Sequence, residues 1–431
     1  MIKKHVLLNK MVLIGIIILF IGMCVTTSST SNNIIKKSAM GISNGNTLYV
    51  GGTGEGNYSY IQDAIDNASD GDTVFVYNGM YDAVFITINK SIKLIGESKY
   101  NTIINGTGIS IDVSEVTIIG FTLQNWSLIF IGSNNGTINN NTITNNIFKS
   151  NKEQFGLGGI LIFNSSYNTI SDNTFFNCGF IILGPIGHNS IINNTINDKP
   201  IVYFEGASNK VIDNAGQIIL VNCENINVEN LELTNTLYSI QLINSKNCLI
   251  SKNRIFNNGI GGYFFNSSNN IVKQNIFSNN LYGLLFIFCG KNKIIKNSFQ
   301  TNDFGLIFFN SSCNLISQNN FKFKYLSINH HMLSTGSDNR WFRNFWNRPR
   351  LLPMLIWNFK FIRGDRRVTI LPVSPDIDWL PAKKPNDINS TAVNIRELML
   401  NVKKNSVSNM FLFNMFFEDF SILKKILSFK T

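Results

Sequence analysis

Short apolar segments of three to five residues, each bounded by Asn, Ser or Gly, repeat along most of the chain. One Asn per repeat, here called an anchor, recurs at steps of 21, 20, 16, 23, 22, 22 and 22 residues. The anchors are Asn173, Asn194, Asn214, Asn230, Asn253, Asn275, Asn297 and Asn319. No window sustains the 3.6-residue spacing of an amphipathic helix, so the pattern predicts short β-strands.

A period near 22 residues predicts a solenoid of stacked repeats. A leucine-rich repeat would show a helical half, and a propeller blade would need about twice the period. We therefore predict an all-β parallel β-helix, with three strands per coil and roughly 4.8 Å between coils. Asn tolerates the left-handed conformation of sharp bends, and stacked Asn amides can hydrogen-bond from coil to coil. The anchors are accordingly expected to be architectural.

Composition divides the chain into segments with different expected roles. The apolar run Met11–Val25 follows three lysines and is typical of a signal peptide, although an uncleaved membrane anchor is the alternative. The predicted segments are 1–28, signal peptide; 29–45, flexible lead; 46–338, β-helix; 339–390, Pro/Trp-rich basic cap; and 391–431, a C-terminal segment with an amphipathic helix.

Both ends of a solenoid expose apolar side chains and unpaired strand edges, which need a cover. The spacing of Ile61, Ala64, Ile65 and Ala68 predicts a helix over Tyr60–Ala68 at the first coil, with Ser59 as its N-cap. The tryptophans of segment 339–390 predict an aromatic cap at the last coil. The alternative for that segment, which is rich in Lys and Arg, is a surface that binds a polyanion or lipid headgroups.

The far C-terminal stretch, 410–429, carries one polar stripe on an otherwise apolar helix. Its charged residues argue against a bilayer span. It can lie at a membrane surface, dock on another subunit or dock on its own cap, and the sequence leaves these open.

The net charge of +11 falls to about +8 without the three lysines of the signal segment. Nucleic acid is a poor candidate partner for an exported protein. The cysteines show no CxxC pair and the four histidines form no cluster, so we predict buried thiols and no transition-metal site.

The stretch from Ile61 to Glu97, with Gly71-Asp72-Thr73, Gly79 and Tyr81, resembles the opening of pectate-lyase-like right-handed β-helix proteins. The later Asn-rich coils resemble the repeats of the NosD-like group of that superfamily, and the resemblance spans roughly residues 47–323. It implies a right-handed, exported β-helix. The resemblance also suggests a role in copper delivery. Copper needs Met, Cys or His ligands brought together, and none converge in the sequence, so we expect no copper delivery.

The residues that directly precede the anchors contain the best candidate catalytic acids of the chain. In successive repeats they are Asp172, Asn193, Asp213 and Glu229, so three of four are acidic and make up an acidic column. Such acids could bind Ca²⁺ or act as a sugar-cleaving pair. The alternative is a solvated turn, because the series continues as Lys252, Gln274, Lys296 and Gln318. We expect a non-catalytic cell-surface or envelope scaffold that binds a glycan or an envelope protein, with a polysaccharide lyase or glycoside hydrolase as the alternative.

Overall fold

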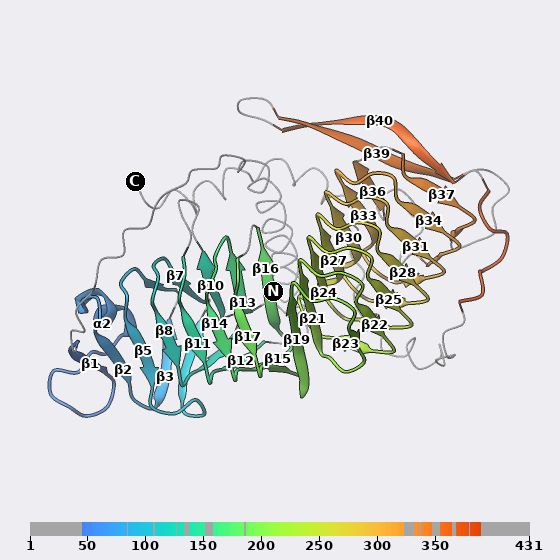
Figure 1. The fold of residues 1–431 in the computed structure, drawn as a ribbon. Helices are drawn as coiled ribbons and strands as arrows, with labels where there is room; N and C mark the ends of the chain where they lie inside the picture. Colours follow the sequence, from blue (N-terminus) through green and yellow to red (C-terminus); the bar gives the residue numbers. More distant parts are fainter. Residues whose placement is uncertain are drawn as a thin grey trace, which may run out of the picture. The chain divides into compact units, whose positions relative to one another are not determined.

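The computed structural model describes residues 45–388, except residues 84, 107, 126, 133–137, 151–157, 185–186, 323–331, 336–337, 347–353, 364–367 and 379. Within these residues the chain forms a parallel β-helix, as the Asn period predicts (Figure 1). No helix of this described part is long and apolar enough to cross a membrane. The predicted signal peptide and C-terminal helix, and the flexible lead apart from residue 45, lie outside it.

A complete coil contributes one strand to each of three parallel sheets, which we call the first, second and third sheet in chain order. The N-terminal coils end at Ile196, and the C-terminal coils begin at Lys199.

The N-terminal coils contain these strands. In the first sheet they are β1 (Thr47–Val50), β2 (Thr73–Val76), β5 (Lys93–Gly96), β8 (Thr117–Ile119), β11 (Thr142–Thr144), β14 (Thr169–Ser171) and β17 (Ser190–Ile192). In the second they are β3 (Gly79–Ala83), β6 (Thr102–Gly106), β9 (Thr122–Gln124), β12 (Ile147–Lys149), β15 (Thr174–Phe176) and β18 (Thr195–Ile196). In the third they are β4 (Ile86–Ile88), β7 (Gly108–Ile111), β10 (Leu128–Gly132), β13 (Gly159–Phe163) and β16 (Gly179–Leu183).

The C-terminal coils repeat the same order of three strands, and among the described strands they pair with the N-terminal coils only through the antiparallel pair of β18 and β19. In the first sheet they give β20 (Val211–Ile212), β22 (Asn227–Glu229), β25 (Leu249–Ser251), β28 (Ile271–Lys273), β31 (Lys293–Ile295), β34 (Leu315–Ser317) and β37 (Arg340–Phe342). In the second they give β23 (Glu232–Thr234), β26 (Arg254–Phe256), β29 (Ile276–Ser278), β32 (Ser298–Gln300), β35 (Asn320–Lys322) and β38 (Phe345–Trp346). In the third they give β19 (Lys199–Glu205), β21 (Gln217–Val221), β24 (Tyr238–Ile243), β27 (Ile260–Phe265), β30 (Tyr282–Ile287), β33 (Phe304–Phe309) and β36 (Met332–Thr335).

Like residues stack on like in the core, as the repeat requires. In the second sheet the rings of Phe277, Phe299, Phe321 and Trp346 form one column, with successive centroids 5.1, 4.9 and 4.7 Å apart. These separations match the spacing of neighbouring strands, which is about 4.8 Å. Offset-stacked aromatic pairs add stabilisation beyond their buried area. The column therefore fixes the register of the C-terminal coils.

The ladder of strands is interrupted between β18 and β19, which pair with each other as an antiparallel hairpin through Asn197 and Asp198. Side chains cover the backbone edge that this break exposes on β16. The buried Gln217 and Gln241 accept the N–H groups of Phe180 and Ile182, and both donate to the Phe180 carbonyl. A buried backbone group without a partner is costly, so these amides stabilise the end of the N-terminal coils.

Several third-sheet strands are buried on both faces. Every residue of β13, β16, β21, β24 and β30 is buried. The outward side chains of Ile219, Val221 and Ile243 pack with the core of the N-terminal coils. Continuous apolar runs are typical of strands covered on both faces. This sheet is thus unsuited to display polar ligand-binding groups.

At the first coil, α2 (Ile61–Asn67) forms the predicted cap and buries Ile61, Ala64 and Ile65. The N-cap is Tyr60 and makes no side-chain cap hydrogen bond, so the prediction of Ser59 was wrong. Lys90 stabilises the end of this helix instead, because its Nζ donates to the carbonyls of Ile65, Asp66 and Ala68.

The β-helix extends further than the predicted boundary at residue 338. Strands β37 and β38 add a further parallel layer, in which Trp341 and Trp346 are buried in the core. The following strands, β39 (Met354–Arg363) and β40 (Val368–Asp378), form a long antiparallel hairpin, and β40 carries Pro372 and Pro375 (Figure 1). Proline is tolerated in such a hairpin at the end of the sheets because it need not donate to a central ladder.

Candidate functional site

The anchor asparagines form hydrogen-bonded ladders inside the coil. Asn173 donates from its backbone N and its Nδ2 to Oδ1 of Asn194. In the C-terminal coils the same pair of bonds links Asn253 to Asn275, Asn275 to Asn297, Asn297 to Asn319 and Asn319 to Asn344, with distances of 2.8–3.0 Å. The ladder ends on the carboxylate of Asp378. These buried amides have no capacity left for a ligand.

Asn214 and Asn230 do not belong to this ladder. The strand register aligns Ile212, Val228 and Ile250, which places Ala215 and Leu231 at the position that Asn253 occupies in its coil. The Leu231 N–H donates to Asn253 Oδ1, so the ladder begins there. The coil between β20 and β21 has no described second-sheet strand and is shorter than the others. Asn214 and Asn230 therefore lie one residue before the position that Asn253 occupies in its coil.

The same one-residue offset breaks the predicted acidic column. Asp172 lies on a left-handed turn after the first sheet, with φ of 57°. Glu229 instead ends strand β22, in register with Ser251, and Asp213 follows β20 at the equivalent place. The three acids therefore occupy two different positions of the coil. Among the described residues no three His, Cys, Asp or Glu side chains gather in a way that could hold a metal ion. The geometry gives no support to a calcium site or a sugar-cleaving pair made of these acids.

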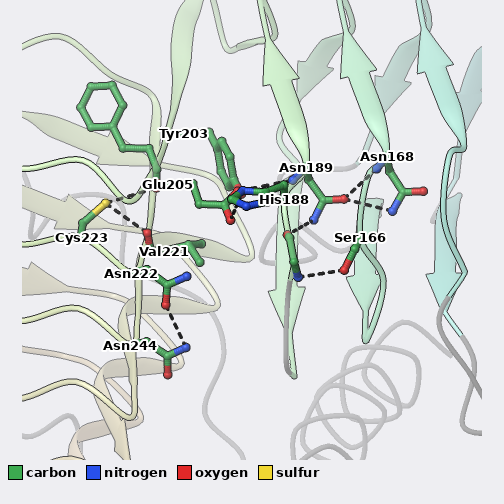
Figure 2. Close-up of polar contacts among 12 residues, drawn as sticks. Ser166, Asn168, His188, Asn189, Tyr203, Glu205, Val221, Asn222, Cys223 and Asn244 are labelled. Carbon is green, nitrogen blue, oxygen red and sulfur yellow. Dashed lines mark hydrogen bonds and ion pairs between the residues drawn. The ribbon is translucent and has the colours of Figure 1, made fainter. Parts of the chain in front are cut away.

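Titratable groups do converge at the break between the two sets of coils (Figure 2). Glu205, at the end of β19, accepts the Tyr203 hydroxyl on Oε2 at 2.8 Å, and its Oε1 lies 3.1 Å from Nδ1 of His188. The Glu205 side chain is 13% exposed, whereas that of His188 is 80% exposed. Burial, and then the bond to Glu205, raise the pKa of Tyr203 far above its usual range.

The neighbours of Glu205 explain why a carboxylate lies there. A second amide ladder runs from Asn141 through Asn168 to Asn189. The backbone N–H of Asn189 then donates to Glu205 Oε2 at 3.4 Å. Glu205 thus ends this ladder as Asp378 ends the other one. The pair with His188 orients the imidazole, and the carboxylate satisfies the last backbone donor of the ladder.

A different surface gathers exposed functional groups on the turn between the first and second sheets of the C-terminal coils. We call the set of residues at this turn the turn column; it consists of Asn230, Lys252, Gln274, Lys296, Gln318 and Arg343. Each has a positive φ between 54° and 59°. Each of the first five donates its backbone N–H to the first-sheet strand of the next coil, so the residues stack one above another. Asn230, Lys252, Lys296 and Arg343 are exposed, and the two glutamines are half-buried.

The local sequence explains this exposure. Each turn-column residue precedes a ladder position whose side chain points inward, so its own side chain must point to solvent. Within the described residues Lys252, Lys296 and Arg343 form no salt bridge, while Arg254 is paired with Glu232. From Lys246 to Lys322 the sequence holds eight Lys or Arg residues and one acid, Asp303. The turn column is therefore a positively charged strip along the coil axis.

The residues of this strip can be read in the sequence, but their alignment on one turn depends on the strand register, which the sequence did not reveal. From the sequence alone, Lys252, Gln274, Lys296 and Gln318 continue the series of Asp172, Asp213 and Glu229, and Arg343 belongs to the predicted cap. The acid-poor stretch around them was the signal that could have identified a cationic surface. Of the basic residues predicted in the C-terminal cap, Arg340 and Arg343 are exposed on the last parallel layer.

A family model matches part of the C-terminal coils. Residues 201–349 match the model of the NosD family, described as periplasmic copper-binding protein. The described cysteines of this region do not fit a copper site: Cys223, Cys248 and Cys289 are buried with thiols that donate to backbone carbonyls, and the exposed Cys313 belongs to no group of three or more His, Cys, Asp or Glu side chains within the described residues. Burial raises the pKa of Cys248 to about 11 and that of Cys289 to about 12, which disfavours the thiolate that binds a metal.

Several solved structures are similar to the chain. The A-module of the Azotobacter vinelandii mannuronan C-5 epimerase AlgE6 is 15% identical, with 65% of this chain and 94% of that chain covered and a TM-score of 0.29. PfbA, a surface adhesin of Streptococcus pneumoniae, is 13% identical, with 75% and 95% covered and a TM-score of 0.29.

The catalytic domain of a GH87 α-1,3-glucanase in complex with nigerose is 12% identical, with 71% of each chain covered and a TM-score of 0.32. Likeness at this level carries no argument about function. A search of curated protein sequences finds no significant match. The coil register shows a parallel β-helix, and residues 201–349 of it are similar to the NosD family.

Proposed function

We propose that the protein is an exported scaffold that binds an acidic polysaccharide along the turn column and does not cleave it. The observation that carries this proposal is the stacked, exposed and acid-free series of Lys252, Lys296 and Arg343, with glutamines between them. A solenoid presents such groups on one rigid line, and a polysaccharide is a ligand of matching linear form. Rigid presentation lowers the entropy that binding costs.

A non-catalytic role agrees with the positions of the acids. Asp213 and Glu229 lie one register position before the turn column, Asp172 lies on the corresponding turn of the N-terminal coils, and Glu205 accepts the last donor of a ladder. A neutral sugar polymer would leave the cations without partners. A carboxylated polymer pairs with them, with an affinity that falls as salt rises, because exposed charges are screened.

The test compares two triple variants that lose the same charge. Lys252→Ala/Lys296→Ala/Arg343→Ala empties the turn column, whereas Lys93→Ala/Lys210→Ala/Lys291→Ala removes three exposed cations elsewhere. Binding of polymannuronate, hyaluronan and neutral dextran is measured by calorimetry. Each exposed ion pair contributes roughly 0.5–1 kcal/mol, so we expect the first variant to bind acidic polymers about 10–100-fold more weakly and the control to change less than about threefold.

Equal losses in both triple variants would refute the turn column as the binding surface. Cleavage is tested in the same panel, with and without Ca²⁺, by release of reducing ends and unsaturated products. Cleavage that disappears in Asp172→Ala/Asp213→Ala/Glu229→Ala, or in Glu205→Ala, would show a lyase or hydrolase and overturn the non-catalytic proposal.

A further inference from the structure

The turn column has an internal order that a general cationic surface does not need. From the second member onward it alternates strictly between cation and amide: Lys252, Gln274, Lys296, Gln318 and Arg343. Since coils stack at about 4.8 Å, like groups recur at about 10 Å along the axis. The backbone bonds between successive coils hold the Cα atoms on this spacing.

A pyranose in an extended chain advances by a length close to one coil, so successive sugars can face successive members of the turn column. A carboxylate meets a favourable charge at Lys252, Lys296 and Arg343. Opposite Gln274 and Gln318 it meets only an amide, whose donors also suit a hydroxyl or acetamido group. Charge on every second sugar therefore uses every member of the turn column.

We infer that the turn column selects an acidic polysaccharide in which uronate and neutral sugars alternate, over one with a carboxylate on every sugar. This inference rests on the proposed function, because it names the polymer class that the same surface prefers. Lys273 lies one residue before Gln274, but at the end of β28 on the outer face of the first sheet. Its register neighbours are Ser251 and Ile295, so it belongs to a different line of residues.

The experiment converts the alternating series into a continuous cationic one. In Gln274→Lys/Gln318→Lys every member from Lys252 to Arg343 is a cation. The control, Asn257→Lys/Thr301→Lys, adds the same charge at the same two-coil separation on the turn after the second sheet, where both residues also have positive φ. Affinities for hyaluronan, with alternating uronates, and for polymannuronate, with uronate at every residue, are measured at one salt concentration and expressed per carboxylate.

We expect the unchanged protein to bind hyaluronan at least about fivefold more tightly per carboxylate than polymannuronate. The Gln274→Lys/Gln318→Lys variant should reduce or reverse this ratio, while the control should raise both affinities and keep the ratio. Lys273→Ser, which introduces the residue that Ser251 provides in the preceding coil, should weaken both polymers by the same factor, because Lys273 lies outside the turn column.

The outcomes separate the two proposals. If the unchanged protein binds neither acidic polymer, or if emptying the turn column has no effect, the proposed function fails. Two results would refute only the alternating preference. In the first, binding depends on the turn column but the two polymers bind equally per carboxylate. In the second, Gln274→Lys/Gln318→Lys and Asn257→Lys/Thr301→Lys change the ratio of hyaluronan to polymannuronate affinity alike.

Discussion

Replacing Asn297 with alanine tests whether the inner asparagines hold the coils together. Oδ1 of Asn297 accepts the backbone N–H and the Nδ2 of Asn275, each at 3.0 Å. Its own Nδ2 donates to the Val272 carbonyl at 2.8 Å and to Asn319 Oδ1 at 3.0 Å. The residue is fully buried, so water cannot replace these partners.

The magnitude follows from these contacts. Each net hydrogen bond contributes about 1 kcal/mol, and a buried donor left without a partner costs about 1–3 kcal/mol. Asn297→Ala removes these four bonds and a fifth, from Nδ2 to the Ile295 carbonyl at 3.2 Å, and it leaves the Asn275 N–H without an acceptor. We expect the free energy of unfolding to fall by about 3–5 kcal/mol, which is a large part of the stability of a typical domain.

The assay is urea unfolding, read by circular dichroism and by hydrogen exchange of the coils around residue 297. The matched control is Asn257→Gly, at an exposed left-handed turn where glycine is conformationally permitted, and it should change stability by less than about 0.5 kcal/mol. A loss below about 1 kcal/mol in Asn297→Ala, or equal losses in the two variants, would refute the ladder as a source of stability.

Three further outcomes are expected. Gln217→Leu should destabilise the protein by about 2–4 kcal/mol and speed hydrogen exchange in β16, because the Phe180 N–H loses its acceptor; unchanged exchange there would contradict the edge-covering role. In a Cys24→Ser background, Cys313 is the exposed thiol of the described part and should react fast with a thiol reagent, and Cys313→Ser should abolish the fast phase. Burial raises the pKa of Cys248 from 9.0 to about 11, so the thiol stabilises the fold fully below about pH 9 and loses this effect as pH rises through about 11. The stability advantage over Cys248→Ala should shrink across that window, and a constant difference would refute it.

The sequence determined the fold because the β-helix repeats one local rule. Asn at a sharp bend and apolar residues at fixed offsets predict a coil wherever they recur, and Phe277, Phe299 and Phe321 stack as their 22-residue spacing requires. The helix at the first coil could also be predicted, since its apolar face repeats every three to four residues. The N-cap of this helix could not be predicted, because the choice between Ser59 and Tyr60 depends on the backbone conformation with which the chain enters the helix.

Tertiary structure decided what depends on register between distant coils. A one-residue shift separates a buried ladder position from an exposed turn, and the irregular coil before β21 hides that shift from the sequence. Only the register shows that Asn230 belongs with Lys252, and that Asp172 and Glu229 face different ways. The roles of Glu205 and Asp378 likewise depend on the tertiary structure, because each carboxylate accepts the backbone N–H of the last asparagine in an amide ladder.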